Sequence, residues 1–173
     1  PPRSTLFPYT TLFRSFRINE VNTWFESSFN LVKEFIAEGG YRLYPNRLSL
    51  PKEVNSGSMI TIAHRWNNLG WGYCPANIPV WNQKYKVAFG LMDGNGNVVT
   101  SMVDNQTDLS KWLKGTPSSY VFTTSISGVP AGLYKWVVAI VDVTKNNVPG
   151  IQISAKENIT ATGWLQLFDV KIK

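Results

Sequence analysis

From residue 41 to the C-terminus, the chain consists of short runs in which apolar and polar residues alternate. Ile60, Ile62 and Trp66, for example, fall on one face of an extended strand. Turn residues bound each run, and residues 93–96 (DGNG) are a strong hairpin signal. The nearly continuous apolar run 133–143 is expected at the centre of a sheet. The sequence therefore predicts a mainly β fold, an antiparallel β-sandwich of immunoglobulin-like or jelly-roll-like type, with strands at 41–50, 58–66, 85–92, 98–103, 119–126, 133–143 and 164–172.

Residues 18–38 show a different period. Apolar residues recur there at spacings of three and four, which places one set on a single helix face: Ile18, Val21, Phe25, Phe29, Val32 and Ile36. Two glycines follow at 39 and 40, as is common just past the end of a helix. We therefore expect one helix over 18–38, with a wide apolar face that must be buried against another element.

The composition fits one globular domain, because 173 residues with 43% apolar content can bury one core but hardly two. The net charge is +6, but lysines and arginines are scattered and form no block, which argues against a nucleic-acid partner. No apolar run reaches the roughly 18 residues of a membrane span, so we expect no membrane partner. The single cysteine, Cys74, excludes an internal disulfide and a cysteine-based zinc site.

Residues 64–81 concentrate three of the seven tryptophans with a tyrosine, the only histidine and the only cysteine. Aromatic faces stack on the C–H face of a sugar ring, and planar amide and guanidinium groups bind its hydroxyls. The stretch therefore predicts an aromatic-rich loop that binds a polysaccharide or oligosaccharide, through Arg65, Trp66, Asn67, Asn68, Trp71, Tyr73 and Trp81. The alternative is structural: these rings plug one end of the sandwich or pack against a neighbouring domain.

No arrangement of residues predicts catalysis. His64 is in phase with the apolar residues of its run, so we expect it to face the core with its nitrogens hydrogen-bonded. Cys74 precedes a proline in a loop, which is typical of an incidental thiol. Residues 93–104 share part of the spacing of a calcium loop, but valine replaces the required glycine, which favours a hairpin. The acidic residues are dispersed, so we expect a chain that is not an enzyme and has no catalytic residues, metal site or cofactor.

Several short motifs follow one another along the chain: GGYRL at 39–43, HRWNNLGWG at 64–72, WLKG at 112–115 and VPAGLY at 129–134. In this order they resemble the C-terminal β-sandwich of uncharacterised bacterial proteins, domain-of-unknown-function family 4832, over residues 31–173. The resemblance implies an accessory domain that follows a catalytic (β/α)-barrel similar to glycoside hydrolases. It also implies a parent protein that processes polysaccharides and is secreted, periplasmic or on the cell surface. The helix would then be the end of the upstream barrel.

Residues 1–15, PPRSTLFPYTTLFRS, fit neither period, and prolines and polar residues interrupt any signal-peptide core. They resemble the codon-by-codon translation of a common short-read sequencing adapter, over all fifteen residues. This resemblance implies an artefactual segment at the start of a truncated, metagenomic fragment. We therefore expect three parts: an adapter-derived segment at 1–15, the end of an upstream barrel at 16–38, and a β-sandwich at 39–173.

Overall fold

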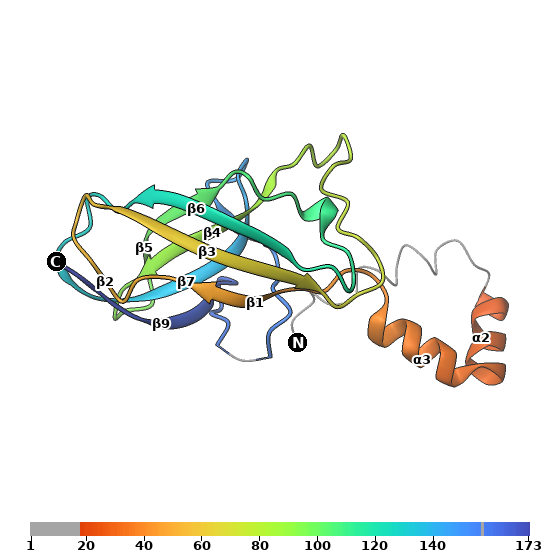
Figure 1. The fold of residues 1–173 in the computed structure, drawn as a ribbon. Helices are drawn as coiled ribbons and strands as arrows, with labels where there is room; N and C mark the ends of the chain where they lie inside the picture. Colours follow the sequence, from red (N-terminus) through yellow and green to blue (C-terminus); the bar gives the residue numbers. More distant parts are fainter. Residues whose placement is uncertain (1–17, 157) are drawn as a thin grey trace.

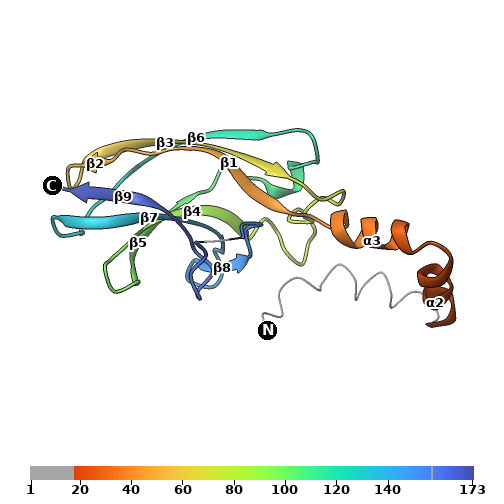
Figure 2. The ribbon, with the colours of Figure 1, turned by 90° about the horizontal axis from the view of Figure 1, so that it is seen from below.

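Two β-sheets stacked face to face make up most of the chain (Figure 2). In the computed structural model, which describes residues 18–156 and 158–173, sheet A has the spatial order β1 (Leu43–Ser49), β3 (Met59–Asn68) and β6 (Ser118–Ser125). Sheet B has the order β2 (Glu53–Val54), β9 (Leu165–Ile172), β7 (Gly132–Asp142), β4 (Tyr85–Met92) and β5 (Val98–Asp104), and β8 (Val148–Ile151) also pairs with β7. These strands pair antiparallel, apart from β2 with β9. The predicted mainly β, antiparallel sandwich is confirmed.

Strand β7 lies inside sheet B, as its apolar sequence predicts. It is flanked by β4 on one side and by β9 and β8 on the other, and residues 136–142 are buried. The hairpin prediction is also confirmed. Between β4 and β5, the Asp93 carboxylate accepts the backbone N–H groups of Asn95 (2.9 Å) and Asn97 (2.8 Å). Gly96 has a φ of +86°, which glycine adopts at little cost.

The alternation of apolar residues did not predict β2 or β8. β2 has only two residues, and β8 contains Pro149 and Gly150, which are depleted in strands. Strand β3 is longer than predicted: it continues two residues beyond the predicted run and ends at Asn68. The first part of the expected aromatic loop is therefore a strand.

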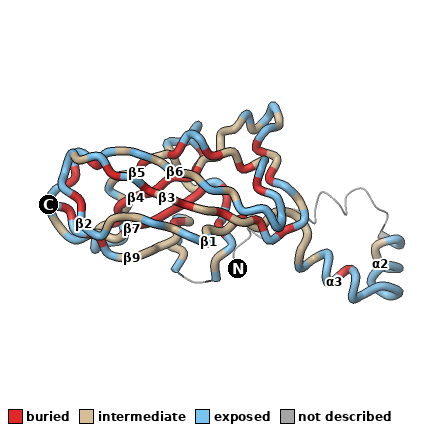
Figure 3. Tube along the Cα trace, in the orientation of Figure 1, coloured by how far each residue is buried: buried red, intermediate tan, exposed pale blue. Residues whose placement is uncertain are grey.

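The core between the sheets is rich in tryptophan. Trp66 of β3, Trp136 of β7 and Trp112 have no exposed area, and Figure 3 shows the buried stretches of the facing strands. An aromatic side chain buries roughly 150–250 Å². These three rings therefore contribute a large share of the apolar area that stabilises the sandwich.

The helical region contains two helices, which corrects the single helix expected over 18–38. α2 (Ile18–Ser27) and α3 (Phe29–Glu38) meet at Ser28, whose φ of −142° is not helical, and the chain turns sharply there (Figure 1). The hydroxyls of Thr23 and Ser27 donate to backbone carbonyls four residues earlier, at 2.8 Å and 2.7 Å. Such bonds bend and weaken a helix. These two bonds favour a bend in the last turns of α2, next to the break, and an apolar period does not reveal them.

The C-terminal end of α3 is hydrogen-bonded to the loop that follows β3. The backbone N–H of Trp71 donates to the carbonyl of Glu38 (2.9 Å), and that of Gly72 donates to the carbonyl of Gly40 (2.7 Å). A Cβ built on Gly70 would lie 2.1 Å from the same Gly40 oxygen, so only glycine allows this approach. These contacts join α3 to the sandwich across the predicted boundary between helix and sandwich.

The adapter-like residues 1–15 lie outside the described residues. Among the helices of residues 18–156 and 158–173, none is long and apolar enough to cross a membrane.

Candidate functional site

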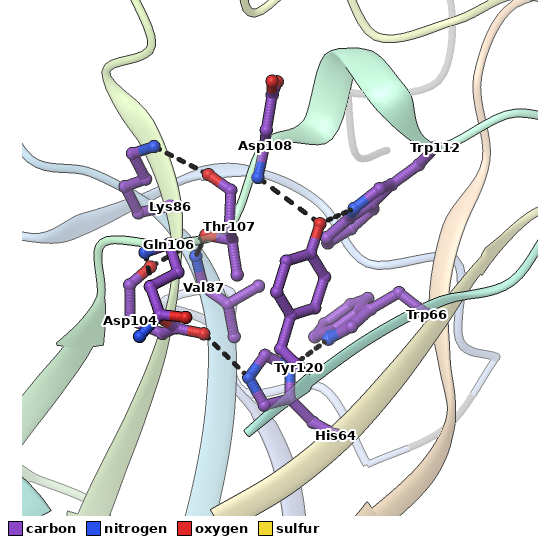
Figure 4. Close-up of polar contacts among 10 residues, drawn as sticks. All are labelled: His64, Trp66, Lys86, Val87, Asp104, Gln106, Thr107, Asp108, Trp112 and Tyr120. Carbon is purple, nitrogen blue, oxygen red and sulfur yellow. Dashed lines mark hydrogen bonds and ion pairs between the residues drawn. The ribbon is translucent and has the colours of Figure 1, made fainter. Parts of the chain in front are cut away.

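A buried row of hydrogen bonds connects the two sheets (Figure 4). His64 Nε2 lies 3.0 Å from Asp104 Oδ2, and the indole Nε1–H of Trp66 donates to His64 Nδ1 at 2.9 Å. His64 and Trp66 belong to β3 of sheet A, whereas Asp104 ends β5 of sheet B, and all three residues are buried. The prediction that His64 faces the core with its nitrogens hydrogen-bonded is confirmed.

This row fixes the tautomer of the imidazole. An indole N–H can only donate, so His64 Nδ1 must be the acceptor. Nε2 then carries the ring proton and donates it to Asp104, whose other oxygen accepts the N–H of Gln106 (2.9 Å). The only histidine of the chain therefore has both nitrogens engaged inside the core.

Aromatic rings pack around this row of hydrogen bonds. The rings of Trp66 and Trp112 stack with centroids 5.1 Å apart, and Tyr120 stacks on His64 at 5.3 Å. The indole N–H of Trp112 donates to the Tyr120 hydroxyl at 2.7 Å. Trp66 is thus enclosed by the core and cannot stack on a sugar, so its expected role as a ligand residue is wrong.

Asn68 also points inward, where its amide shapes the loop after β3. Its Oδ1 accepts the N–H groups of Arg42 (2.8 Å) and Gly70 (2.9 Å). Its Nδ2 donates to the carbonyls of Gly72 (2.7 Å) and Trp112 (3.0 Å). These four bonds use the full hydrogen-bonding capacity of the amide. Asn68 therefore holds the loop rather than a ligand, which corrects its predicted role.

The other predicted rings lie in the loop between β3 and β4. Trp71 and Tyr73 are exposed, with 61% and 46% of their surface accessible. The Trp71 indole N–H donates to the Glu38 carboxylate at 2.6 Å, and Lys114 Nζ lies 5.2 Å from the Trp71 ring centroid. Trp81 is half-buried and packs edge-on against Tyr85, the first residue of β4. Trp71 and Tyr73 can therefore meet a ligand, whereas Trp81 helps to hold the loop.

Cys74 lies in the same loop and is fully buried. Burial raises the pKa of its thiol to about 12, so the thiol is protonated at neutral pH. Because the thiolate is the nucleophilic form, this cysteine is chemically quiet in the folded protein.

Thiol labelling tests this placement. At mildly alkaline pH, the native protein should react with a disulfide reagent or iodoacetamide at least about tenfold more slowly than the protein in guanidinium chloride, where the thiol regains a pKa of about 8.5. The measurement is the labelling rate with and without denaturant. Equal rates would show that Cys74 is accessible in the native state.

Arg65 and Asn67 lie on the outer face of sheet A, because they alternate with inward-pointing residues of β3. The register places Tyr44 of β1 opposite Asn67, and Arg47 opposite Arg65. Asn67 Nδ2 donates to Tyr44 Oη at 2.9 Å, and Arg65 Nε donates to Asn46 Oδ1 at 3.0 Å. We call Tyr44, Asn46, Arg47, Arg65 and Asn67 the sheet A polar face.

The three members of this face that lie on β1 were not predicted from the sequence. Their partners on β3 are about twenty residues away along the chain, and a local sequence pattern does not reveal which residues of two strands lie opposite each other. The available signal was the alternation of the run 41–50, which marks residues that point away from the core.

An apolar groove of about 450 Å³ lies between the two helices and the loop after β3. Its walls include Val21, Trp24, Phe25, Leu31, Phe35 and Trp71. Trp24, Phe25, Leu31 and Phe35 are all exposed. An exposed apolar surface of this kind is typical of protein–protein and ligand-binding sites.

Comparison with known proteins shows a fold-level likeness only. No family model and no curated protein matches the chain. The CARDB domain of the PF1109 protein from Pyrococcus furiosus, solved in complex with di-metal ions, is 17% identical over 76% of this chain and 93% of that one, with a TM-score of 0.40. A Niemann-Pick type C2 protein from the Japanese carpenter ant is 8% identical over 78% and 96%, with a TM-score of 0.41. A beta-glucosidase from Listeria innocua is 14% identical over 77% of this chain but 16% of its own, with a TM-score of 0.38. At these values the likeness carries no argument about function, and the resemblance to family 4832 stays a prediction.

Proposed function

We propose that this chain is a non-catalytic accessory domain that binds carbohydrate on the sheet A polar face. The observation that carries the proposal is the grouping of two planar amides, two guanidinium groups and a phenol hydroxyl on one face of sheet A. Asn46 and Arg47 are exposed there, and Tyr44, Arg65 and Asn67 are half-buried. Planar polar groups of this kind fix the hydroxyls of a sugar, while aromatic rings cover its C–H face.

Two further observations support a ligand at this end of sheet A. Asn67 Oδ1 is buried and has no hydrogen-bond partner within the described part of the chain, and a buried acceptor of this kind calls for a partner such as an ordered water or a ligand group. The exposed rings of Trp71 and Tyr73 follow directly after β3, at the end of the sheet where α3 joins the sandwich (Figure 1). They can supply the aromatic part of the site.

The proposal assigns no chemistry to the domain itself. His64 is committed to the core, and Cys74 is a buried, protonated thiol. From the resemblance to family 4832, we further propose that the domain accompanies a glycoside-hydrolase-like barrel in a bacterial protein that acts on polysaccharides outside the cytoplasm.

Affinity electrophoresis on plant and bacterial polysaccharides tests the binding function. The wild-type chain should be retarded by at least one glycan, and Asn67→Ala and Tyr44→Ala should each remove most of the retardation. Asn95→Ala is the matched control, because Asn95 lies in the exposed turn between β4 and β5 and should behave as wild type. A wild-type chain that no glycan retards would refute the function. The retardation that Trp71→Ala loses would measure how much the loop after β3 contributes to binding.

A second candidate is a purely structural domain that packs against the upstream barrel. The apolar groove between the helices favours it, because its walls are almost entirely apolar. In that case the isolated chain should bind a hydrophobic dye, and the double variant Phe25→Ser, Phe35→Ser should reduce dye fluorescence. Unchanged dye fluorescence in this variant would contradict the structural candidate.

A further inference from the structure

We infer that the carbohydrate bound by the sheet A polar face is acidic, with the carboxylate of a uronic acid held between Arg47 and Arg65. This inference rests on the proposed function and adds the class of sugar. It begins with the strand register, in which Arg47 of β1 lies directly opposite Arg65 of β3 on the same outer face. Like charges in directly opposed positions destabilise a sheet.

No acidic side chain offsets this repulsion. Strands β1, β3 and β6 contain no aspartate or glutamate. Among the described residues, no carboxylate lies within 4.0 Å of either guanidinium. The acids of sheet B pair elsewhere, as in Lys84 with Asp142 (3.3 Å). The face therefore keeps two positive charges that nothing in the described part of the chain compensates.

The local structure of β1 orients one of these charges. The pairing of β1 with β3 shifts between Pro45 and Arg47, so Asn46 is an extra residue in the ladder. Its Oδ1 accepts the Nε–H of Arg65 at 3.0 Å. This bond leaves the two terminal NH2 groups of Arg65 without partners among the described residues. A bulge of this kind re-aims a side chain, and a guanidinium already held in place loses less entropy when it binds a carboxylate.

The chemistry of a uronic acid matches both parts of the face. A guanidinium group binds a carboxylate through two parallel, charge-assisted hydrogen bonds. Asn67 and Tyr44, which lie in the adjoining row, offer an amide and a hydroxyl to the sugar hydroxyls. A neutral sugar would use the amide and the hydroxyl but would leave the charge of the two arginines uncompensated.

Calorimetric titration with oligogalacturonate and with the same oligomer in fully methyl-esterified form tests the inference. The two ligands share one sugar backbone and differ in charge. We expect binding of the free acid and at least about tenfold weaker binding of the ester, because the ester loses the charge-assisted hydrogen bonds to the guanidinium groups. Equal binding of both forms would overturn the inference and leave the proposed function intact. Binding of neither form, nor of any neutral glycan, would remove both.

Charge variants locate the carboxylate. Arg47→Gln and Arg65→Gln should each weaken binding of the acidic oligomer by roughly tenfold. Arg65→Lys should bind it as weakly as Arg65→Gln, because an ammonium group lacks the two parallel N–H groups with which a guanidinium holds a carboxylate. Lys145→Gln is the control, since it removes one positive charge from the distant turn between β7 and β8. If Lys145→Gln weakened binding as much as Arg47→Gln and Arg65→Gln, the effect would come from overall charge, and the inference would be overturned. Equal displacement by inorganic sulfate, or tighter binding of a single-stranded oligonucleotide, would do the same.

Thermal unfolding provides a readout that does not depend on the ligand. Because Arg47 faces Arg65 without a compensating acid, Arg47→Gln should leave the melting temperature unchanged or raise it slightly. The variant is therefore expected to fold, and its loss of binding can be interpreted. A clear fall in melting temperature would show that Arg47 makes a stabilising contact inside the protein, which would contradict a guanidinium kept free for a ligand.

Discussion

Replacing Asp104 with asparagine should lower the free energy of unfolding by about 2–3 kcal/mol, although the two side chains have nearly the same shape. The carboxylate accepts two N–H groups, from His64 Nε2 and from the backbone of Gln106. An asparagine has only one oxygen, so its NH2 group must face one of these donors. His64 cannot reverse its tautomer, because the Trp66 indole N–H occupies Nδ1. The expected fall in melting temperature is roughly 5–10 °C.

A double-mutant cycle with Trp66→Phe tests this reasoning. Without the indole N–H, Nδ1 of His64 is free to carry the ring proton, and Nε2 can then accept from the new amide. Asp104→Asn should therefore cost about 1 kcal/mol less in the Trp66→Phe background than in wild type. The measurement is denaturant unfolding of the four proteins. Strict additivity would show that the three side chains do not act as one network.

The second large effect is expected for Gly70→Ala. Its Cβ would lie 2.1 Å from the carbonyl oxygen of Gly40, and backbone cannot move aside as a flexible side chain can. The loop must separate from the end of α3, with loss of the bonds from Trp71 to Glu38 and from Gly72 to Gly40. We expect a destabilisation of about 1–3 kcal/mol, as for other overpacked sites.

Hydrogen exchange and tryptophan fluorescence measure this effect. The amides of Trp71 and Gly72 should lose protection, and emission should change as Trp71 leaves Glu38. Gly94→Ala is the control, because no atom lies within 4 Å of its Cβ position. Native protection of both amides in Gly70→Ala would contradict the close approach of the two segments.

Strand positions followed from the sequence because a two-sheet core requires one apolar face on each strand. The same alternation also decides the orientation of residues 64–68. His64 is in phase with Ile60 and Ile62, so Trp66 and Asn68 must point inward while Arg65 and Asn67 point outward. Residues 64–66 belong both to the predicted strand 58–66 and to the predicted aromatic loop 64–81, and only the strand alternation gives their orientation correctly. Trp66 and Asn68 point inward, so the prediction that they bind sugar is wrong.

Other features depend on contacts that no local pattern describes. Asp104 meets His64 across forty residues of sequence, and the pairing of Arg47 with Arg65 depends on a bulge. Two hydroxyl groups bond to helix carbonyls just before the break at Ser28, whereas the apolar period runs through the break without interruption. Sequence periodicity thus indicates which face a residue occupies, but the tertiary fold decides which residues it meets.

The bulge in β1 also determines how the strand can change in length. Before it, Leu43 and Pro45 share the side of the inward-facing Asn68 and Trp66, and after it Leu48 shares the side of His64. Asn46 resets the alternation, so deleting this one residue would turn Leu48 towards solvent or Leu43 out of the core. A deletion in the exposed β4–β5 turn carries no such consequence for the opposite sheet. The spacing within β1 is therefore as important as the identity of its side chains, and natural variants of this chain should differ in length in the turns while keeping the residue count of β1.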